Sequence, residues 1–164
     1  MNDPMQGVFR GFDIAASGLR AELQRSEIVV ANLSNMHDTG NVENLPYRRR
    51  GIVFEEAMQD AMRIHGVKGG DKLAAGVRVS EVYEDLVSPF RKFYDEGHPD
   101  AYRSKGPQDP NKGEHGWVYG SNVNVFYELV DLMMIERSYQ AKLASMRSYR
   151  NMVRSTISNI SSNR

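Results

Sequence analysis

The last quarter of the chain, residues 122–160, carries a hydrophobic repeat that constrains the fold more than any other feature. Apolar residues recur there at alternating steps of three and four, and only Glu136 and Arg150 interrupt the series. The repeat positions are Val125, Leu129, Leu132, Glu136, Tyr139, Leu143, Met146, Arg150, Val153, Ile157 and Ile160. A period near 3.5 residues indicates an α-helix whose apolar seam packs against another helix, as in a coiled coil.

This C-terminal helix is long enough to require a partner surface. From Ser121 to the end there is no glycine or proline, so no residue interrupts the helix. Its acidic residues come first and its basic residues follow, which complements the helix macrodipole at both ends. A helix of about 35 residues is about 50 Å long at 1.5 Å per residue. Residues 122–164 are therefore predicted to form a C-terminal core helix that packs against another helix.

The N-terminal segment, residues 1–36, repeats the same pattern. Its seam positions are Phe9, Phe12, Ala16, Leu19, Leu23, Ser26, Val30 and Leu33. Gly18 weakens this helix by roughly 1 kcal/mol relative to alanine. We predict one helix from about Gly7 to Met36, ended by the Asp38–Asn41 stretch. The two helices are expected to pair with each other and with copies from neighbouring subunits; the alternative is a helical hairpin within a monomer.

The middle of the chain is predicted to consist of loops and short strands. We expect a connecting stretch at residues 37–60 and a β-rich region with exposed loops at residues 61–121. The expected strands are Gly51–Phe54, Val77–Val79 continuing toward Tyr83, Phe90–Tyr94 as its antiparallel mate after a Ser88–Pro89 turn, and Gly116–Gly120. Residues 55–65 fit a short helix or an irregular continuation, and residues 66–76 and 103–115 read as exposed loops. The predicted fold class is α+β, with a coiled-coil-like pair of terminal helices and a small middle region rich in β-hairpins.

Composition excludes several classes of function. Lys and Arg total 21, as do Asp and Glu, so the chain has no net charge that would favour a nucleic acid or an anionic membrane. There is no cysteine, which excludes disulfides, thiolate metal sites and a cysteine nucleophile. The start of the chain has no secretory signal pattern, and no apolar run is long enough to cross a bilayer. These features fit a cytosolic protein, or one that is exported without a cleaved signal.

The residues that usually carry chemistry do not form a recognisable site. The histidines, His37, His65, His98 and His115, are far apart in sequence and show no metal-ligand spacing. The glycine-rich residues 66–72 do not fit a phosphate-binding loop. The sequence therefore predicts no enzyme, no cofactor, no metal and no small-molecule substrate.

The basic run Arg48–Arg50 is the clearest charge cluster. Contact with a nucleic acid would call for interleaved aromatic residues and a positively charged domain, which this neutral chain lacks. A protein interface and a solvated turn remain as the two other interpretations.

Several motifs resemble those of the flagellar basal-body rod proteins, and the central ones resemble the proximal-rod branch of that family. They occur in order along nearly the whole chain. They are Phe12–Leu19, Val30–Asn35, Pro46–Arg50 with Val53 and Phe54, Gly76–Val79, Ser88–Asp95, Gly97–Ala101, Asn122–Val125 and Glu136–Ala141. The chain departs from the family at Ser34 and Lys142, where alanine and asparagine are usual, and its loops near residues 66–76 and 103–115 are longer.

The resemblance implies a structural subunit that assembles axially through its terminal helices and transmits torque from motor to hook. Its implied partners are other copies of itself, other rod proteins and the flagellar export apparatus. Its implied location is the basal-body rod that crosses the periplasm, reached without a cleaved signal. The expected subunit-interface residues are Leu19, Leu23, Val30, Asn32, Leu33, Asn35, Arg48, Arg49, Leu129, Leu132, Arg137, Tyr139, Gln140, Leu143 and Met146.

Individual roles follow for four of these residues. Asn32 and Asn35 are expected to cap or turn the first helix, and Arg48 and Arg49 to make polar contacts between subunits. Three alternatives stay open from the sequence. They are another axial protein of the rod and hook family, a free helical adaptor that forms no filament, and an enzyme with an unrecognised site in the middle third.

Overall fold

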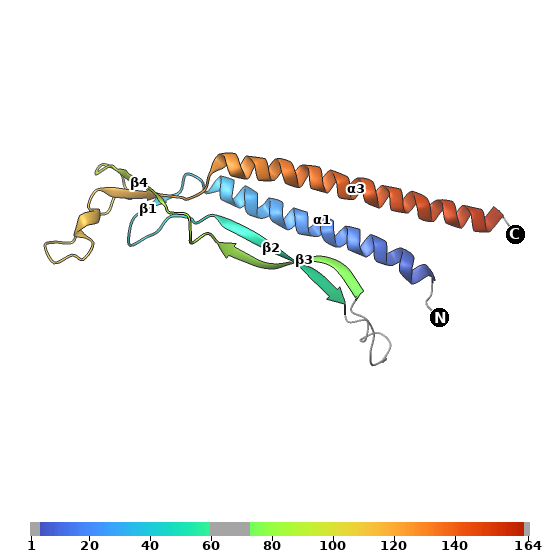
Figure 1. Cartoon of the computed structure of the whole chain (residues 1–164). Coiled ribbons are helices and arrows are strands. Elements are labelled where there is room, and N and C mark those ends of the chain that lie inside the picture. The colour runs from blue at the N-terminus through green and yellow to red at the C-terminus, as the bar shows by residue number, and fades with distance from the viewer. Residues whose placement is uncertain (1–3, 60–72, 163–164) are drawn as a thin grey trace, which may run out of the picture. The chain divides into compact units, whose positions relative to one another are not determined.

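The computed structural model describes residues 4–59 and 73–162, which form an α+β fold with a long helix at each end of the sequence and strands of 2 to 12 residues between them (Figure 1). The elements in order are α1 (Pro4–Ser34), β1 (Thr39–Gly40), β2 (Arg50–Gln59), β3 (Leu73–Glu84), β4 (Arg91–Tyr94), the 3-10 helix η1 (Lys112–Glu114), β5 (Trp117–Gly120) and α3 (Val125–Ser162). The α+β class expected from the sequence is confirmed.

Helix α1 confirms the predicted N-terminal helix and ends two residues earlier than expected. Its last turn is closed by Asn35, whose Nδ2 donates to the Ala31 carbonyl at 2.8 Å. The Asp38 amide then donates to the Asn35 carbonyl at 3.2 Å, which turns the chain away from the helix. A side chain that binds a free carbonyl of the last turn is an ordinary way to end a helix.

Helix α3 confirms the predicted C-terminal helix and begins at an asparagine cap. The Phe126 amide donates to Asn124 Oδ1 at 3.0 Å, and the Glu128 amide donates to the Asn124 carbonyl at 3.1 Å. Asparagine is among the most favourable residues at a helix N-cap because its side-chain oxygen satisfies one of the free amides of the first turn.

The strands form two sheets, and one predicted pairing is wrong. Strand β5 pairs antiparallel with β1 and with β4, with Tyr119 opposite both Gly40 and Lys92. Strands β2 and β3 form a separate two-stranded sheet. The sequence predicted that β3 pairs with β4, but alternation of side chains identifies a strand without identifying its partner. Pairing β4 with β5 instead places Tyr94 against Trp117 in an edge-on aromatic contact, with ring centroids 5.7 Å apart.

The bounds of β2 and β3 also test what the sequence predicted for residues 55–65 and 66–76. Residues 55–59 belong to β2, so the short-helix alternative is wrong there, and residues 60–65 lie outside the described residues. Residues 73–76 belong to β3 rather than to a loop, while residues 66–72 also lie outside the described residues. The expected exposed tract 103–115 is irregular except for η1, and the buried Tyr102 that precedes it donates a hydrogen bond to Asp109 Oδ2 at 2.7 Å.

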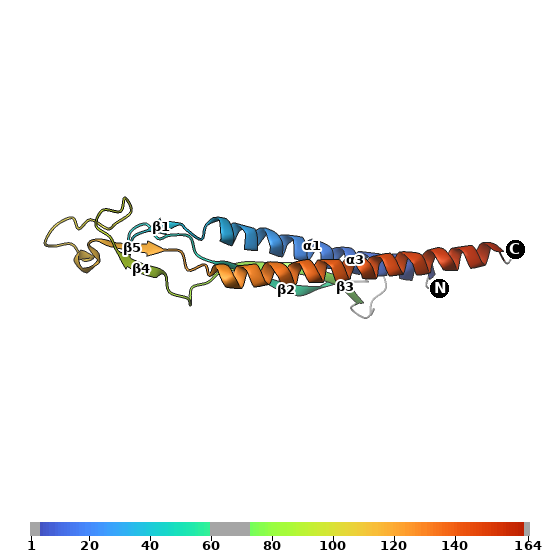
Figure 2. The ribbon, with the colours of Figure 1, turned by 90° about the horizontal axis from the view of Figure 1, so that it is seen from above.

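The described chain divides into two compact units. Among the described residues, unit 1 comprises residues 4–26, 52–59, 73–81 and 133–162, and unit 2 comprises residues 27–51 and 82–132. Within unit 1 the two helices lie side by side in Figure 1 and overlap in the view of Figure 2, and they are joined by hydrogen bonds to Glu22 Oε1 from Ser138 Oγ and Lys142 Nζ, at 2.5 and 2.6 Å. The division into residues 1–36, 37–60, 61–121 and 122–164 stays a prediction.

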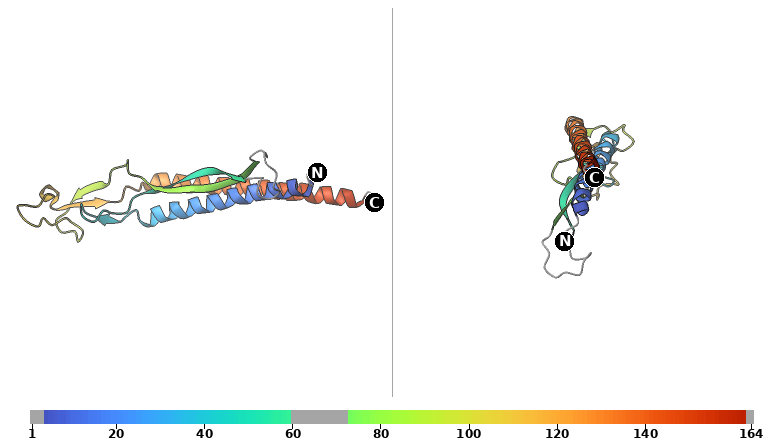
Figure 3. Two further views of the ribbon diagram at one scale, coloured as in Figure 1. Left: turned by 90° about the horizontal axis from the view of Figure 1, so that it is seen from below. Right: turned by 90° about the vertical axis from the view of Figure 1, so that its right-hand side faces the viewer.

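The close packing of unit 1 depends on small residues of α1. A side chain at Gly11 would collide with the Tyr149 ring, and the aliphatic part of Lys142 lies over Gly18. The β2–β3 sheet lies alongside the helices (Figure 3), and the Val77 amide donates to Ser17 Oγ at 3.0 Å. Gly76, with a φ of +121°, approaches the Ser17 side chain so closely that a Cβ atom would overlap it. Glycine is required at this contact for both its backbone angle and its size.

On each helix, some of the residues that are buried are not the residues that the hydrophobic repeat predicted to be buried, but neighbours of those residues in the sequence. On α3, Ile135 is buried and Tyr149 half-buried, whereas the neighbouring predicted positions Glu136 and Arg150 are exposed. On α1, Ala21 and Val29 are buried, whereas Leu23 and Val30 are about half exposed. Small residues allow the backbones to approach closely, so the larger apolar residues remain on the flanks of the contact.

The described residues bury few large apolar side chains. Among residues 11–57 and 76–159, whose burial the structure describes, the buried hydrophobic residues are Ala21, Val29, Ala101, Tyr102, Val118, Tyr119, Val123 and Ile135. In the same two ranges, twenty-one large hydrophobic residues are exposed, including Leu23, Val30, Phe126, Leu129 and Met133. Contiguous exposed apolar surface usually marks a protein interface. No helix in the described parts of the chain combines the length and the apolar character needed to cross a membrane.

Candidate functional site

The strongest constellation of polar groups lies in unit 2 and is centred on the buried Asn32 of α1. Its Nδ2 donates to the Arg50 carbonyl at 2.8 Å and to Glu128 Oε2 at 3.0 Å. Its Oδ1 accepts from the Arg50 amide and from the Tyr47 hydroxyl, both at 2.9 Å. A side-chain amide offers two donor hydrogens and two acceptor lone pairs, so the hydrogen-bonding capacity of Asn32 is fully used.

Glu128, in the first turn of α3, is the second centre of this cluster. It is fully buried, and its Oε1 accepts a hydrogen bond from Arg49 Nε at 2.6 Å. Burial acts to lower the pKa of Arg49, but the hydrogen bond and the charge of Glu128 outweigh it and raise that pKa. A buried carboxylate is tolerated when a cation and hydrogen bonds compensate its lost hydration. Arg49 and Asn32 together supply that compensation.

Asn122 extends the cluster to the segments that follow β3. Its Oδ1 accepts from the Arg49 amide at 2.7 Å, and its Nδ2 donates to the carbonyls of Asp85 and Ser88, at 3.1 and 3.2 Å. Arg48 also donates to the Asp85 carbonyl, at 3.0 Å, and its guanidinium lies 4.1 Å from the centre of the Phe90 ring. That stacking is a favourable cation–π geometry.

We call Asn32, Tyr47, Arg49, Asn122 and Glu128 the polar junction. It connects the end of α1, the 47–50 segment and the start of α3 through hydrogen bonds between residues far apart in sequence. Burial raises the pKa of Tyr47, so its hydroxyl stays protonated and continues to donate to Asn32. The side chains of the polar junction form hydrogen bonds with one another or with the backbone of the same segments, so the polar junction has a structural role: it holds these three segments together.

The structure distributes the predicted interface residues over both units and over different degrees of exposure. The exposed ones are Leu23, Val30, Leu129, Arg137 and Gln140. The half-buried ones are Leu19, Leu33, Asn35, Arg48, Arg49, Leu132, Tyr139, Leu143 and Met146, and Asn32 is buried. The structure brings Asn32 and Arg49 together through Glu128. The assignment of these fifteen residues to a subunit interface stays a prediction.

Two residue roles are clarified by the contacts. Asn35 closes the end of α1, as expected. Asn32 does not cap the helix, because its side chain binds Arg50, Tyr47 and Glu128 instead. Sequence reasoning also missed Glu128, Tyr47 and Asn122 as members of the polar junction. The acidic character of Glu128 was read only as a complement to the helix dipole, and its partners are too distant in sequence for a local pattern to reveal.

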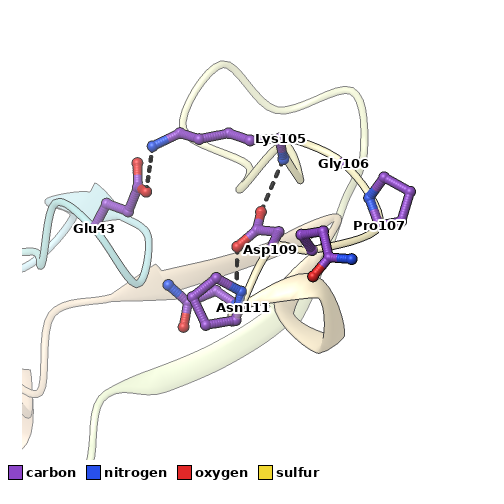
Figure 4. A pocket seen from close by; sticks show the side chains of 8 residues that line it. Glu43, Lys105, Gly106, Pro107, Asp109 and Asn111 are labelled. Atoms are coloured by element: carbon purple, nitrogen blue, oxygen red, sulfur yellow. Dashed lines mark hydrogen bonds and ion pairs between the residues drawn. The ribbon is translucent and has the colours of Figure 1, made fainter.

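The surface of unit 2 also has a hollow lined by charged and polar residues. Glu43 and residues 105–111 line an open hollow of about 480 Å³, in which Lys105 Nζ pairs with Glu43 at 2.5 Å (Figure 4). Asp109 accepts hydrogen bonds from the amides of Lys105 and Asn111, at 2.8 and 2.9 Å, and from the Tyr102 hydroxyl. These hydrogen bonds lower the pKa of Asp109 to about 2, and the bond from the Lys105 amide contributes most. The Asp109 carboxylate therefore stabilises the conformation of the loop that carries it.

Two histidines, His98 and His115, accept hydrogen bonds from nearby backbone amides. His98 Nδ1 accepts from the Asp100 amide at 3.1 Å, and His115 Nδ1 accepts from the Ser104 amide at 3.1 Å. His65 lies outside the described residues. Within residues 4–59 and 73–162, no three histidine or acidic side chains gather in a way that could hold a metal ion.

Comparison with known proteins identifies similar sequences over nearly the whole chain. Residues 114–160 match the family model described as flagellar basal body rod FlgEFG protein C-terminal. The flagellar basal-body rod protein FlgC of Bacillus subtilis strain 168 is 31% identical over 151 residues, which cover 88% of this chain and 93% of that protein. FlgC of Salmonella typhimurium strain LT2 is 32% identical over 146 residues, which cover 89% of this chain and 92% of that protein. FlgC of Borreliella burgdorferi strain B31 is 28% identical, covering 92% and 96%.

Proposed function

The chain belongs to the FlgC family of flagellar basal-body rod proteins, and on this premise we propose that it builds the rod through the exposed apolar faces of α1 and α3. It is a structural subunit of the rod in the flagellar basal body, where it assembles with other rod components. The family is not an enzyme family. The proposal concerns how the subunit makes its contacts.

The observation that carries the proposal is the apolar surface left exposed along both helices. In unit 1, Leu23 on α1 is 49% exposed and Met133 on α3 is 63% exposed. In unit 2, Val30 on α1 is 54% exposed and Phe126 on α3 is 79% exposed. Fully burying an exposed side chain of this kind stabilises by roughly 1.5–3 kcal/mol, so covering the part that is still exposed contributes about half of that or somewhat more for each residue. A repeated head-to-tail contact extends along an axis when the rotation between successive copies does not close into a ring, and we propose that this holds here.

The helix pair is the mechanical core of this proposal. We infer that α1 and α3 pack as a coiled-coil-like pair and that the pair packs against those of neighbouring copies and other rod proteins. The favoured interface residues remain the fifteen predicted from the sequence, of which Leu23, Val30 and Leu129 are the most exposed apolar members. Torque passes from motor to hook through these contacts.

The route to the rod is also part of the proposal. We infer that the flagellar export apparatus passes the chain outward without cleavage and that the assembled rod crosses the periplasm.

The substitution Val30→Asp tests the helix-face interface. Val30 is 54% exposed, so a carboxylate there remains hydrated in the free chain and should change the free energy of unfolding by no more than about 0.5 kcal/mol. In an assembled apolar interface the same carboxylate would lose its hydration without a partner. We expect cells with this variant to express the chain, to incorporate less of it into purified basal bodies and to lose motility.

Gln24→Asp is the matched control, because Gln24 is an exposed polar residue of the same helix. It should leave incorporation and motility unchanged. Normal motility and normal incorporation with Val30→Asp would contradict the proposed interface, while absence of the unmodified chain from basal bodies would contradict the role in the rod itself.

A further inference from the structure

A buried carboxylate lies between the two helices of unit 1. Glu22 on α1 is only 6% exposed, and its Oε1 accepts hydrogen bonds from Ser138 and Lys142 on α3. Its Oε2 is also buried and accepts no hydrogen bond from the described residues. Burial acts to raise the pKa of Glu22, but the hydrogen bonds from Lys142 and Ser138 and the charge of Lys142 outweigh it and lower that pKa. Glu22 is therefore a carboxylate at neutral pH.

This arrangement does not have the features of a contact that mainly adds stability. An ion pair loses hydration when it is buried, and apolar residues of similar size in its place are often equally stable or more stable. The Oε2 atom of Glu22, which is buried without a donor, adds a further penalty. A polar group in the contact between two helices can instead specify their register, because other registers leave it without its partner.

The apolar repeat of α3 selects a register only weakly. Its positions recur every seven residues, so a slip of α3 by seven residues along α1 places repeat positions in the contact again. A slip in one direction would bring Asp131 and Ile135 to Glu22, which sets a second carboxylate beside it. A slip in the other direction would bring Ser145 and Tyr149, which provide hydroxyl groups but no cation. Of these three registers, only the observed one pairs Glu22 with a lysine.

Gly18 allows the lysine to reach the carboxylate. Gly18 and Glu22 are four residues apart on α1, and Ser138 and Lys142 are four apart on α3, so each pair lies on one face of its helix. A Cβ atom at Gly18 would lie 3.4 Å from Lys142 Cε and 3.5 Å from Lys142 Cδ. The aliphatic part of Lys142 therefore crosses α1 at a position without a side chain, and its ammonium group continues to Glu22.

We propose that Glu22, Ser138 and Lys142 fix the register in which α1 packs against α3 in unit 1. The inference rests on the proposed coiled-coil-like pairing of the two helices and names the residues that position them. A fixed register also matters for the rod. A helical assembly repeats the same contact, so every copy must present the same exposed residues at the same places along its helices.

Distance measurements between spin labels on the two helices test the inference, because the chain has no cysteine of its own. Gln24→Cys on α1 and Ser148→Cys on α3 place the labels at exposed positions of unit 1. Double electron–electron resonance then gives the distribution of label distances in the isolated full chain. A slip of seven residues moves one label by about 10 Å along the other helix. We expect one narrow distribution in the chain that keeps Glu22 and Lys142.

Glu22→Leu combined with Lys142→Met removes the ion pair and nearly preserves the side-chain volumes. We expect the thermal unfolding midpoint to stay the same or rise, while the distance distribution widens at least twofold, with components displaced by about 10 Å. A pair that only stabilised the fold would give a lower midpoint and an unchanged distribution. The matched control is Glu55→Leu with Arg78→Met, which removes an ion pair of unit 1 whose side chains are 40% and 69% exposed. It should leave the distribution unchanged.

The possible outcomes separate the register from the wider function. An unchanged, narrow distribution in the Glu22→Leu, Lys142→Met chain would overturn the inference, because other contacts such as the polar junction would then fix the register. Loss of its helical circular dichroism signal would also overturn it, because the pair would then be required for folding. A broad distribution in the chain that keeps both residues would contradict the pairing on which the inference rests. The presence of the chain in basal bodies tests the rod function separately from all three results.

The titration of Glu22 provides a second readout. Lys142→Met removes the charge and one hydrogen bond from the Glu22 carboxylate, and Ser138 remains as a donor. We expect the titration midpoint of the Glu22 carboxyl group, followed by carbon-13 NMR, to be higher in this variant than in the unmodified chain. The same midpoint in both chains would show that the ion pair does not form, and would overturn the inference.

Discussion

At the scale of single residues, the polar junction shows why a buried polar side chain can contribute more to the stability of the fold than an apolar residue of the predicted seam. Asn32 lies between the repeat positions Val30 and Leu33 of α1, and asparagine near the C-terminal end of a helix is often part of a cap. Its partners Arg50 and Glu128 are 18 and 96 residues away in sequence. Local patterns report neighbours three or four residues apart, so they could identify the helix but not the partners of this side chain.

The first prediction concerns Asn32→Ala. The substitution leaves the buried Glu128 with one hydrogen-bond donor fewer and removes the side-chain partner of the Arg50 amide and carbonyl. Unpaired buried polar groups cost about 1–3 kcal/mol each, and more when the group is charged. We expect the free energy of unfolding to fall by about 2–4 kcal/mol, measured by urea denaturation followed by circular dichroism.

Asn35→Ala provides the comparison, because Asn35 makes its bonds only at the half-exposed end of α1. It should cost about 1 kcal/mol or less. Similar losses for the two variants would mean that Asn32 has no special role in the polar junction.

The second prediction concerns the pH dependence of the loop around Asp109. The hydrogen bonds from Lys105, Tyr102 and Asn111 lower its pKa from 3.8 to about 2 in the folded chain. A carboxyl group with a lowered folded pKa contributes stability above its unfolded pKa, and the contribution disappears as the pH falls through the folded value. The loop should therefore keep its order at pH 4 and lose it between about pH 4 and pH 2.

Carbon-13 NMR of the Asp109 carboxyl group would measure this directly, with a titration midpoint near pH 2. In Asp109→Asn the amide signals of Lys105 and Asn111 should no longer shift over that range. A midpoint for Asp109 close to the ordinary value of 3.8 would show that these hydrogen bonds do not form.

At the scale of elements, the sequence predicts what is local and fails where the partner is distant. Both long helices and strand β5 appear where the residue pattern placed them. The pairing of β3 with β2 rather than β4 could not be read from alternation, since either partner satisfies the same pattern. The faces buried on α1 and α3 differ from part of the seam, because Gly18, Ala21 and the Glu22 pair with Lys142 bring the helices together.

The third prediction concerns Gly76, where β3 meets α1 in unit 1. Gly76→Ala places a Cβ atom on the Ser17 side chain and forces alanine into a φ of +121°. Strained backbone of this kind costs of order 1–3 kcal/mol. We expect faster amide hydrogen exchange at Val77, whose amide binds Ser17 Oγ, and a lower free energy of unfolding.

Gly113→Ala is the matched control for this element. No atom lies within 4 Å of a Cβ placed at Gly113, and Gly113 is not among the glycines with positive φ. It should leave the exchange rate of Val77 unchanged. If Gly76→Ala also leaves that rate unchanged, the contact between β3 and α1 does not need glycine.

At the scale of the whole molecule, the family and the general fold class could be predicted because motifs are spread along nearly the entire chain. The details of assembly could not be predicted in the same way, since the residues that contact a neighbour need not follow the pattern that pairs the helices within one chain. Leu23 and Val30 belong to the predicted seam yet remain about half exposed. Their exposure is the physical reason to expect partners along both helices.

The most direct measurement is the accessibility of Val30→Cys to a maleimide reagent, compared between the isolated chain and purified basal bodies. The absence of native cysteine makes the labelling specific to this position. The account predicts rapid labelling of the isolated chain and at least tenfold slower labelling after assembly. Labelling at the same rate in both states would contradict the claim that neighbouring subunits cover the helix faces.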